Sequence, residues 1–180
     1  MNTPIHTAYK PETTPGIKPT HPLDPLTLEE LAEATLLLRK EKQLSPSCRF
    51  PYLQLDEPAK DEVLAFEAGN PISRKAFAVV LDKSTGLIHE AKIDLIAEQI
   101  IEWKQLDPEV SGQPPIMIEE FFSCVDIVQA DEGFRAAVKR RGLTDKDIEN
   151  IQIDPWSFGY YGDDEKYRGR RLMRGVAFVR

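Results

Sequence analysis

The chain has 180 residues, of which 41% are hydrophobic and 29% charged, and its net charge at pH 7 is −7. This composition is typical of a soluble globular protein with one ordinary domain or two small ones. The negative charge argues against a nucleic-acid-binding surface, which needs a basic stripe. No apolar run approaches the roughly 20 residues required to cross a bilayer. The sequence therefore predicts neither nucleic-acid nor membrane partners.

The N-terminal stretch MNTPIHTAYKPETTPGIKPTH, residues 1–21, is rich in proline and polar residues. It lacks the basic start and the apolar segment of a secretory signal. If Met1 is the natural start, the protein is expected to be cytoplasmic. We interpret this stretch as a disordered tail rather than a binding motif.

Side chains that usually bind metals or carry chemistry form no pattern in this sequence. Cys48 and Cys124 are far apart and have no spacing motif, so both are expected to be free thiols. His6, His21 and His89 share no ligand spacing. There is no nucleophile elbow, phosphate-binding glycine loop or zinc-protease motif. The residues alone thus predict no catalytic, cofactor or metal site.

After the tail, the sequence predicts one helix and then several strands. Thr27 and Glu30 form the capping box of a helix, whose expected buried face is Leu28, Leu31, Thr35 and Leu38. Strand-like segments follow at residues 50–55, 76–82 and 87–95, the last two joined by a turn over 84–86. The segment 96–106 fits both a helical and a strand period, and periodicity leaves the choice open.

The stretch DPEVSGQPP contains three prolines and a glycine and predicts a linker, beyond which the plan begins again. One face of the next helix is expected to be Ile118, Phe121, Val125 and Val128. Asp131 is placed to cap a further helix that ends at Gly142. Ile151 and Ile153 alternate like a strand, and the final residues are the next strand.

A helix followed by strands thus occurs twice, which predicts an α+β protein of two small units. The expected division is a tail at 1–21, a first domain at 22–107, a linker at 108–115 and a second domain at 116–180. The terminal strand, RRLMRGVAFVR, would leave an unpaired sheet edge, which folded proteins rarely expose. We therefore expect the second domain to be incomplete.

Two charged segments allow a functional and a simpler interpretation. Asp163, Asp164 and Glu165 offer oxygens to a hard cation, but the simpler interpretation as a solvated loop is the one we favour. The basic residues of 170–180 suit a phosphate or an acidic partner. Pairing with the acidic run across a hairpin also accounts for them.

Several segments, in their order along the chain, together resemble the N-terminal region of the copper-containing primary-amine oxidases. They are HPLDPLTLEEL, LQLDEPAKDEVLAF, RKAFAVVLD, HEAKIDL, EWKQLDPEVSGQPPIMIEEF, GFRAAVKRRGLTDKDIENIQIDPWSFGYYG and GRRLMRGVAFV. The resemblance implies that 96–106 is a strand. It also implies two cystatin-like units, each a helix packed on a four-stranded antiparallel sheet, the second truncated at its C-terminal end.

The resemblance further implies a parent enzyme that converts a primary amine, O2 and water to an aldehyde, ammonia and H2O2, using copper and topaquinone. In the family, the copper ligands, the aspartate base and the quinone-forming tyrosine lie in a later β-sandwich domain. This chain is thus expected to be a fragment without a cofactor of its own and without catalytic activity. Its expected partner is that β-sandwich domain of the same parent, which is expected to be a homodimer.

In the family, the second small domain helps to wall the channel by which amines reach the quinone. Phe121 and Trp156 match channel-lining positions, where aromatic rings favour apolar amines and contact an ammonium group. The simpler interpretations are that Phe121 packs the helix face with Val125, and that Trp156 packs with Tyr160 and Tyr161.

A function of a different class is a freestanding cystatin-like module, without enzymatic activity, that binds a protein or a small ligand. Its missing strand would come from a partner or from dimerisation.

Overall fold

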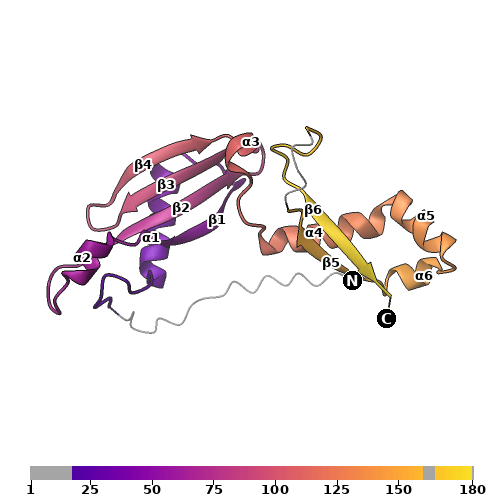
Figure 1. Ribbon diagram of the computed structural model, residues 1–180. Coiled ribbons are helices and arrows are strands. Elements are labelled where there is room, and N and C mark those ends of the chain that lie inside the picture. Colours follow the sequence, from indigo (N-terminus) through magenta and orange to yellow (C-terminus); the bar gives the residue numbers. More distant parts are fainter. Residues whose placement is uncertain (1–17, 160–164, 180) are drawn as a thin grey trace. The chain divides into compact units, whose positions relative to one another are not determined.

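The computed structural model describes residues 18–159 and 165–179 (Figure 1). The described residues group into two compact units. One contains the chain up to Pro46, Leu53–Ala78 and Ala91–Trp103, and the other contains Ser47–Tyr52, Val79–Glu90 and the chain from Lys104 onward. The division between these two units runs across the N-terminal sheet. The domain boundaries predicted at 107 and 116 stay a prediction.

The first half of the chain forms two helices and a four-stranded antiparallel sheet with the strand order β1-β2-β3-β4. The elements are α1 (Leu28–Glu41), β1 (Cys48–Leu55), α2 (Lys60–Leu64), β2 (Lys75–Asp82), β3 (Ile88–Asp94) and β4 (Gln99–Leu106). The segment whose periodicity was ambiguous is therefore a strand, as the resemblance implied. The hairpin between β2 and β3 is also confirmed: Asp82 N donates to Leu87 O at 2.9 Å, and Gly86 supplies the positive φ of +76°.

Helix α1 begins where its capping residues require it to begin. Glu30 N donates to Thr27 Oγ1 at 3.1 Å, and Thr27 N donates to Glu30 Oε2 at 2.8 Å, so two free backbone donors of the first turn are satisfied. Ala34 and Leu38 are fully buried. Leu28, expected on the buried face, is instead 70% exposed because burial begins only after the first turn.

Arg74, the residue before β2, joins the start of α1 to the sheet. Its Nε and Nη2 donate to the two carboxylate oxygens of Glu30 at 2.7 and 2.8 Å. Its Nη1 and Nη2 also donate to the carbonyls of Asp24 and Pro25 at 2.8 and 3.1 Å. Arg74 is 4% exposed, and these four bonds satisfy a charge that would otherwise be costly to bury. We call this arrangement the Glu30–Arg74 clamp.

The second half of the chain forms four helices and a two-stranded sheet. The elements are α3 (Pro108–Ser111), α4 (Ile118–Ala130), α5 (Glu132–Arg140), α6 (Asp145–Ile148), β5 (Gln152–Ser157) and β6 (Met173–Phe178). β5 and β6 are antiparallel, with Gln152 opposite Phe178 and Ser157 opposite Met173. Within residues 18–159 and 165–179, the second sheet contains only these two of the four strands that the resemblance implied.

Helices α4 and α5 of the second half were predicted, whereas the short helix α3 lies where the sequence predicted a linker. Asp131 caps α5, as predicted, because its side chain accepts a hydrogen bond from Phe134 N at 2.7 Å. Gly142 follows that helix with a φ of +84°, also as predicted. The sequence did not predict α6, a single turn whose start is stabilised by a hydrogen bond from Thr144 N to Asp147 Oδ2 at 2.7 Å.

The core of the second half lies between its helices and the β5–β6 sheet. The buried residues are Val138, Ile148, Ile151 and Ile153, packed against Val125, Val128, Phe134 and Leu143. Ile118, expected on the buried face of α4, is 71% exposed because it is the first residue of the helix. At Gly175 in β6, a Cβ atom would lie 3.1 Å from Val128 Cγ2 and 3.3 Å from Ile153 Cγ2. Helix α4 therefore approaches the sheet closely at this glycine.

Gly175→Val is expected to destabilise the chain by about 1–3 kcal/mol, because the new side chain overpacks the contact between α4 and β6. The free energy of unfolding would be measured by urea titration. Ala177→Val is the matched control, since Ala177 lies in the same strand and already carries a Cβ atom. Equal losses in the two variants would show that Gly175 does not set the helix–sheet distance.

Candidate functional site

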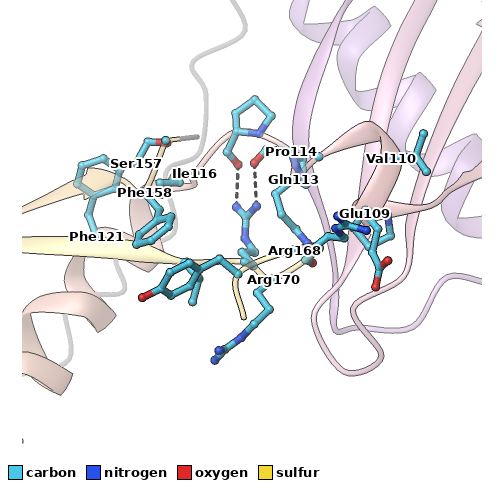
Figure 2. Close-up of a pocket in the computed structure, with 18 residues that line it drawn as sticks. Glu109, Val110, Gln113, Pro114, Ile116, Phe121, Ser157, Phe158, Arg168 and Arg170 are labelled. Carbon is cyan, nitrogen blue, oxygen red and sulfur yellow. Dashed lines mark hydrogen bonds between the residues drawn. The ribbon is translucent and has the colours of Figure 1, made fainter. Parts of the chain in front are cut away.

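A pocket of about 740 Å³ lies within the second unit (Figure 2). Its walls come from α3 and the segment after it, from the start of α4, and from residues 157–159 and 167–172. Figure 2 shows Phe121 and Phe158 on one side of the pocket and Glu109 and Val110 on the other. The pocket therefore depends on segments that are far apart in the sequence.

Gly169 fixes one wall of the pocket against the other. Its φ is +66°, and a Cβ atom there would lie 2.8 Å from Glu109 Cγ and 3.4 Å from Glu109 N. Gln113 Nε2 also donates to Gly169 O at 2.6 Å. Both the left-handed backbone and the close approach require glycine at this position.

Arg171 makes the same set of contacts in this unit as Arg74 does in the other. Its Nε and Nη2 donate to the two carboxylate oxygens of Glu120, both at 2.6 Å. Its Nη1 and Nη2 donate to the carbonyls of Pro114 and Pro115 at 2.7 and 2.8 Å, the two dashed lines of Figure 2. We call this the Glu120–Arg171 clamp. It joins the segment before α4, the first turn of α4 and the segment before β6.

The electrostatics of Glu120 follow from the clamp. The carboxylate also accepts a hydrogen bond from Met117 N at 2.8 Å. Burial by itself would raise the pKa of Glu120, but the hydrogen bonds from Arg171 and Met117 and the charge of Arg171 hold that pKa below its ordinary value. The side chains of Arg171 and Glu120 are only 20% and 16% exposed. The two charges therefore compensate one another, and Arg171 has its donors engaged within the protein.

The remaining lining suits a ligand with an apolar body. Phe121, Phe158 and Tyr167 contribute rings, and those of Phe158 and Tyr167 lie 4.9 Å apart between centroids. Arg168 and Arg170 are exposed at the pocket, so charged groups border the aromatic wall. Within the part of the chain that the structure describes, no three His, Cys, Asp or Glu side chains could together hold a metal ion. The arrangement can bind and orient a molecule.

The structure places the two predicted channel residues on different sides of the β5–β6 sheet. Phe121 lines the pocket. Trp156, in β5 opposite Arg174, is 57% exposed and does not line it. Ile153 faces the core beneath α4, and since side chains alternate along a strand, Trp156 points to the other face. The pocket thus does not bring these two residues together, and their channel role stays a prediction.

The simpler packing interpretations of Phe121 and Trp156 can also be compared with the structure. Ile116 and Phe121 occupy the two positions of a hydrophobic staple around the start of α4, and both line the pocket. Val125, the suggested neighbour of Phe121, packs against the core of the second half. Tyr160 and Tyr161, the suggested partners of Trp156, lie outside the described residues.

The acidic and basic segments lie only partly within the described residues. Asp163 and Asp164 lie outside the described residues, so the cation site and the hairpin pairing stay predictions. Arg171, one of the basic residues concerned, pairs with Glu120 instead. Cys48 and Cys124 form no disulfide with one another, as expected. Over residues 18–159 and 165–179, no helix combines the length and apolar character needed to cross a membrane.

Sequence reasoning missed both clamps and the pocket. A signal for the clamps was nevertheless available, because PLTLEE at residues 25–30 and PIMIEE at 115–120 repeat one pattern. In each copy the last glutamate binds an arginine that also reaches the carbonyls of the proline and of the residue before it. No comparable local signal marks the pocket, whose walls meet only in the folded chain.

Comparisons with known proteins agree on one family. The sequence matches the AGAO-like N2 domain over residues 27–102 and the N3 domain of copper amine oxidase over residues 119–180. A primary amine oxidase of Arthrobacter sp. (strain P1) is 41% identical over 160 residues, which are 89% of this chain and 23% of that protein. A histamine oxidase of Arthrobacter globiformis is 33% identical over 160 residues, covering 88% of this chain and 22% of that protein.

A solved structure agrees at the level of the fold. The crystal structure of a copper-containing benzylamine oxidase from Hansenula polymorpha matches with a TM-score of 0.70 over 88% of this chain and 25% of that one. At 17% identity, this likeness shows the fold alone. The chain spans less than a quarter of the length of the two Arthrobacter relatives.

The stabilisation provided by Glu120 is expected to depend on pH. Its folded-state pKa lies below the ordinary value of 4.5, so the stabilisation is fully present above that pH and is lost as the pH falls through the lower folded-state pKa. Glu120→Gln should therefore cost about 1–3 kcal/mol at pH 7 and less in acid. Urea titrations of both proteins from pH 7 to pH 3 check this. A difference that stays constant over the range would contradict it.

Proposed function

Because the chain belongs to the copper amine oxidase family and carries its N2 and N3 domains, we propose that it forms the non-catalytic front of a primary-amine oxidase. The whole protein would convert a primary amine, O2 and water to an aldehyde, ammonia and H2O2. The observation that carries this proposal is the match of 89% of this chain to only 23% of a primary amine oxidase. Copper and topaquinone, typical of the family, would be held by the rest of the polypeptide.

The proposed role of this chain is to wall the entrance through which amines arrive. Support comes from the pocket, where Phe121 and Phe158 lie on one side (Figure 2). Aromatic rings favour an apolar amine body and attract an ammonium group through their faces. Trp156, an exposed tryptophan on the other face of the sheet, would border the path at a separate place. Its large apolar ring suits a surface that another domain covers.

The proposed partner is the catalytic β-sandwich domain of the same polypeptide, in a protein that forms a homodimer. The cytoplasmic location and the disordered tail stay predictions. A second candidate, a binding module without enzymatic activity, is favoured by β6: within the described residues it pairs only with β5, which leaves an edge open for strand addition.

The isolated chain is expected to be inactive. The 180-residue chain would be purified, supplied with Cu²⁺ and given methylamine and benzylamine, and H2O2 would be followed by a coupled peroxidase assay. No amine-dependent peroxide above that of Cu²⁺ alone is expected. A sustained amine-dependent signal would show that the chain contains catalytic groups and would overturn its non-catalytic role.

In the whole protein, Phe121→Ala and Trp156→Ala are each expected to change kcat/KM unevenly across amines of different size, by up to about tenfold. The matched control is Phe122→Ala, because Phe122 is the next residue of α4 but is exposed and does not line the pocket. Steady-state kinetics with a series of amines from methylamine to benzylamine measure the effect. A uniform loss for all amines would indicate a folding defect and contradict the channel role.

A further inference from the structure

The two clamps have equivalent sets of hydrogen bonds but different surroundings. Arg74 binds Glu30 and two carbonyls in one unit. Arg171 binds Glu120 and two carbonyls in the other unit, and there the arginine and both prolines also line the pocket. The second clamp is therefore both a stabilising contact and part of the candidate site.

The start of α4 lacks a side-chain cap hydrogen bond that the start of α1 has. In α1, the hydroxyl of Thr27 accepts a hydrogen bond from Glu30 N, so the side chain of the cap residue supports the first turn. The corresponding residue of α4 is Met117, which has no side-chain oxygen. The side chain of Glu120 still accepts from Met117 N at 2.8 Å, and Arg171 holds that carboxylate in place. The first turn of α4 is thus held in part through Glu120.

Phe121 directly follows Glu120 and belongs to that same first turn. Its ring lies in the pocket wall beside Phe158 and Ser157 (Figure 2). A helix end without a side-chain cap frays readily, since its first backbone donors have no partner within the helix. Movement of the turn would displace the ring, because backbone and ring move together once the side-chain rotamer is set.

We propose that Arg171 is a positioning residue: through Glu120 it holds the first turn of α4, and thereby the ring of Phe121, at the wall of the pocket. This inference rests on the proposed function, in which the pocket borders the path of the amine. The clamp then influences which amine bodies pass, although Arg171 itself has its donors engaged within the protein.

The conservative change Arg171→Lys tests this role. Lysine keeps the positive charge but has no planar fork, so it cannot bind both carboxylate oxygens and both carbonyls at once. Arg74→Lys is a matched control, since it removes the same four contacts at the other clamp. Both variants would be made in the whole protein that carries this chain. Urea titration would show how much stability each one loses.

Two readouts separate positioning from general stability. Hydrogen exchange would measure the protection of the backbone amides of residues 117–122, and Arg171→Lys is expected to raise their exchange about tenfold. Kinetics would measure kcat/KM for methylamine and benzylamine, and Arg171→Lys is expected to change their ratio about tenfold, through KM rather than kcat. Arg74→Lys should leave both the ratio and the exchange of 117–122 unchanged at a similar loss of stability.

The outcomes distinguish the inference from the function on which it rests. If the unaltered protein oxidises amines but the two variants change the ratio equally, the inference is wrong and the function stands. If the unaltered protein oxidises no amine, the proposed function fails and the selectivity role fails with it. Hydrogen exchange of the backbone amides of residues 117–122 would still show whether Arg171 holds the first turn of α4. If Arg171→Lys does not fold, Glu120→Gln takes its place with the same expected readouts.

Discussion

An arginine that binds a glutamate in the first turn of a helix organises both halves of this chain, and it is buried at Arg74 and partly buried at Arg171. The partners are 44 residues apart at Arg74 and Glu30 and 51 residues apart at Arg171 and Glu120. A guanidinium fork matches a carboxylate in shape, and its remaining donors satisfy two carbonyls, which offsets the cost of removing the charges from water. Each clamp thereby fixes where a helix begins relative to a strand that follows much later in the sequence.

The recurrence of the clamp shows that both halves use one local plan. The two copies differ in the residue that caps the helix, and in the second copy the helix start also forms part of the pocket wall. In each, the arginine lies just before a strand, β2 or β6, and the glutamate lies in the first turn of α1 or α4. Thr27 completes the cap of α1, whereas Met117 brings no oxygen to α4. The helix start with the weaker cap is the one that places an aromatic side chain in a pocket. The bonds that stabilise this helix start therefore also hold one wall of the pocket.

How much of the structure could be predicted from the sequence depended on how far apart the interacting residues are along the chain. The cap at Thr27, the turn at Gly86 and the cap at Asp131 are local, and the structure confirms them. Helical spacing could not reveal that the first residues of α1 and α4 are exposed, so the burial expected for Leu28 and Ile118 was wrong. The arginines of the clamps look like surface charges until their distant partners are known. The strand at 96–106 was settled only by the family resemblance.

The candidate site, too, could be predicted only in part from the sequence. Phe121 and Trp156 were both matched to the family's channel, yet alternation along β5 sends Trp156 to the face away from α4. Phe121 has a defined environment within its own unit, so its contribution can be traced through contacts of this chain. Trp156 is mostly exposed, and a ring of that size contributes to recognition only when another surface confines it. Its role therefore depends on what covers that face in the whole protein.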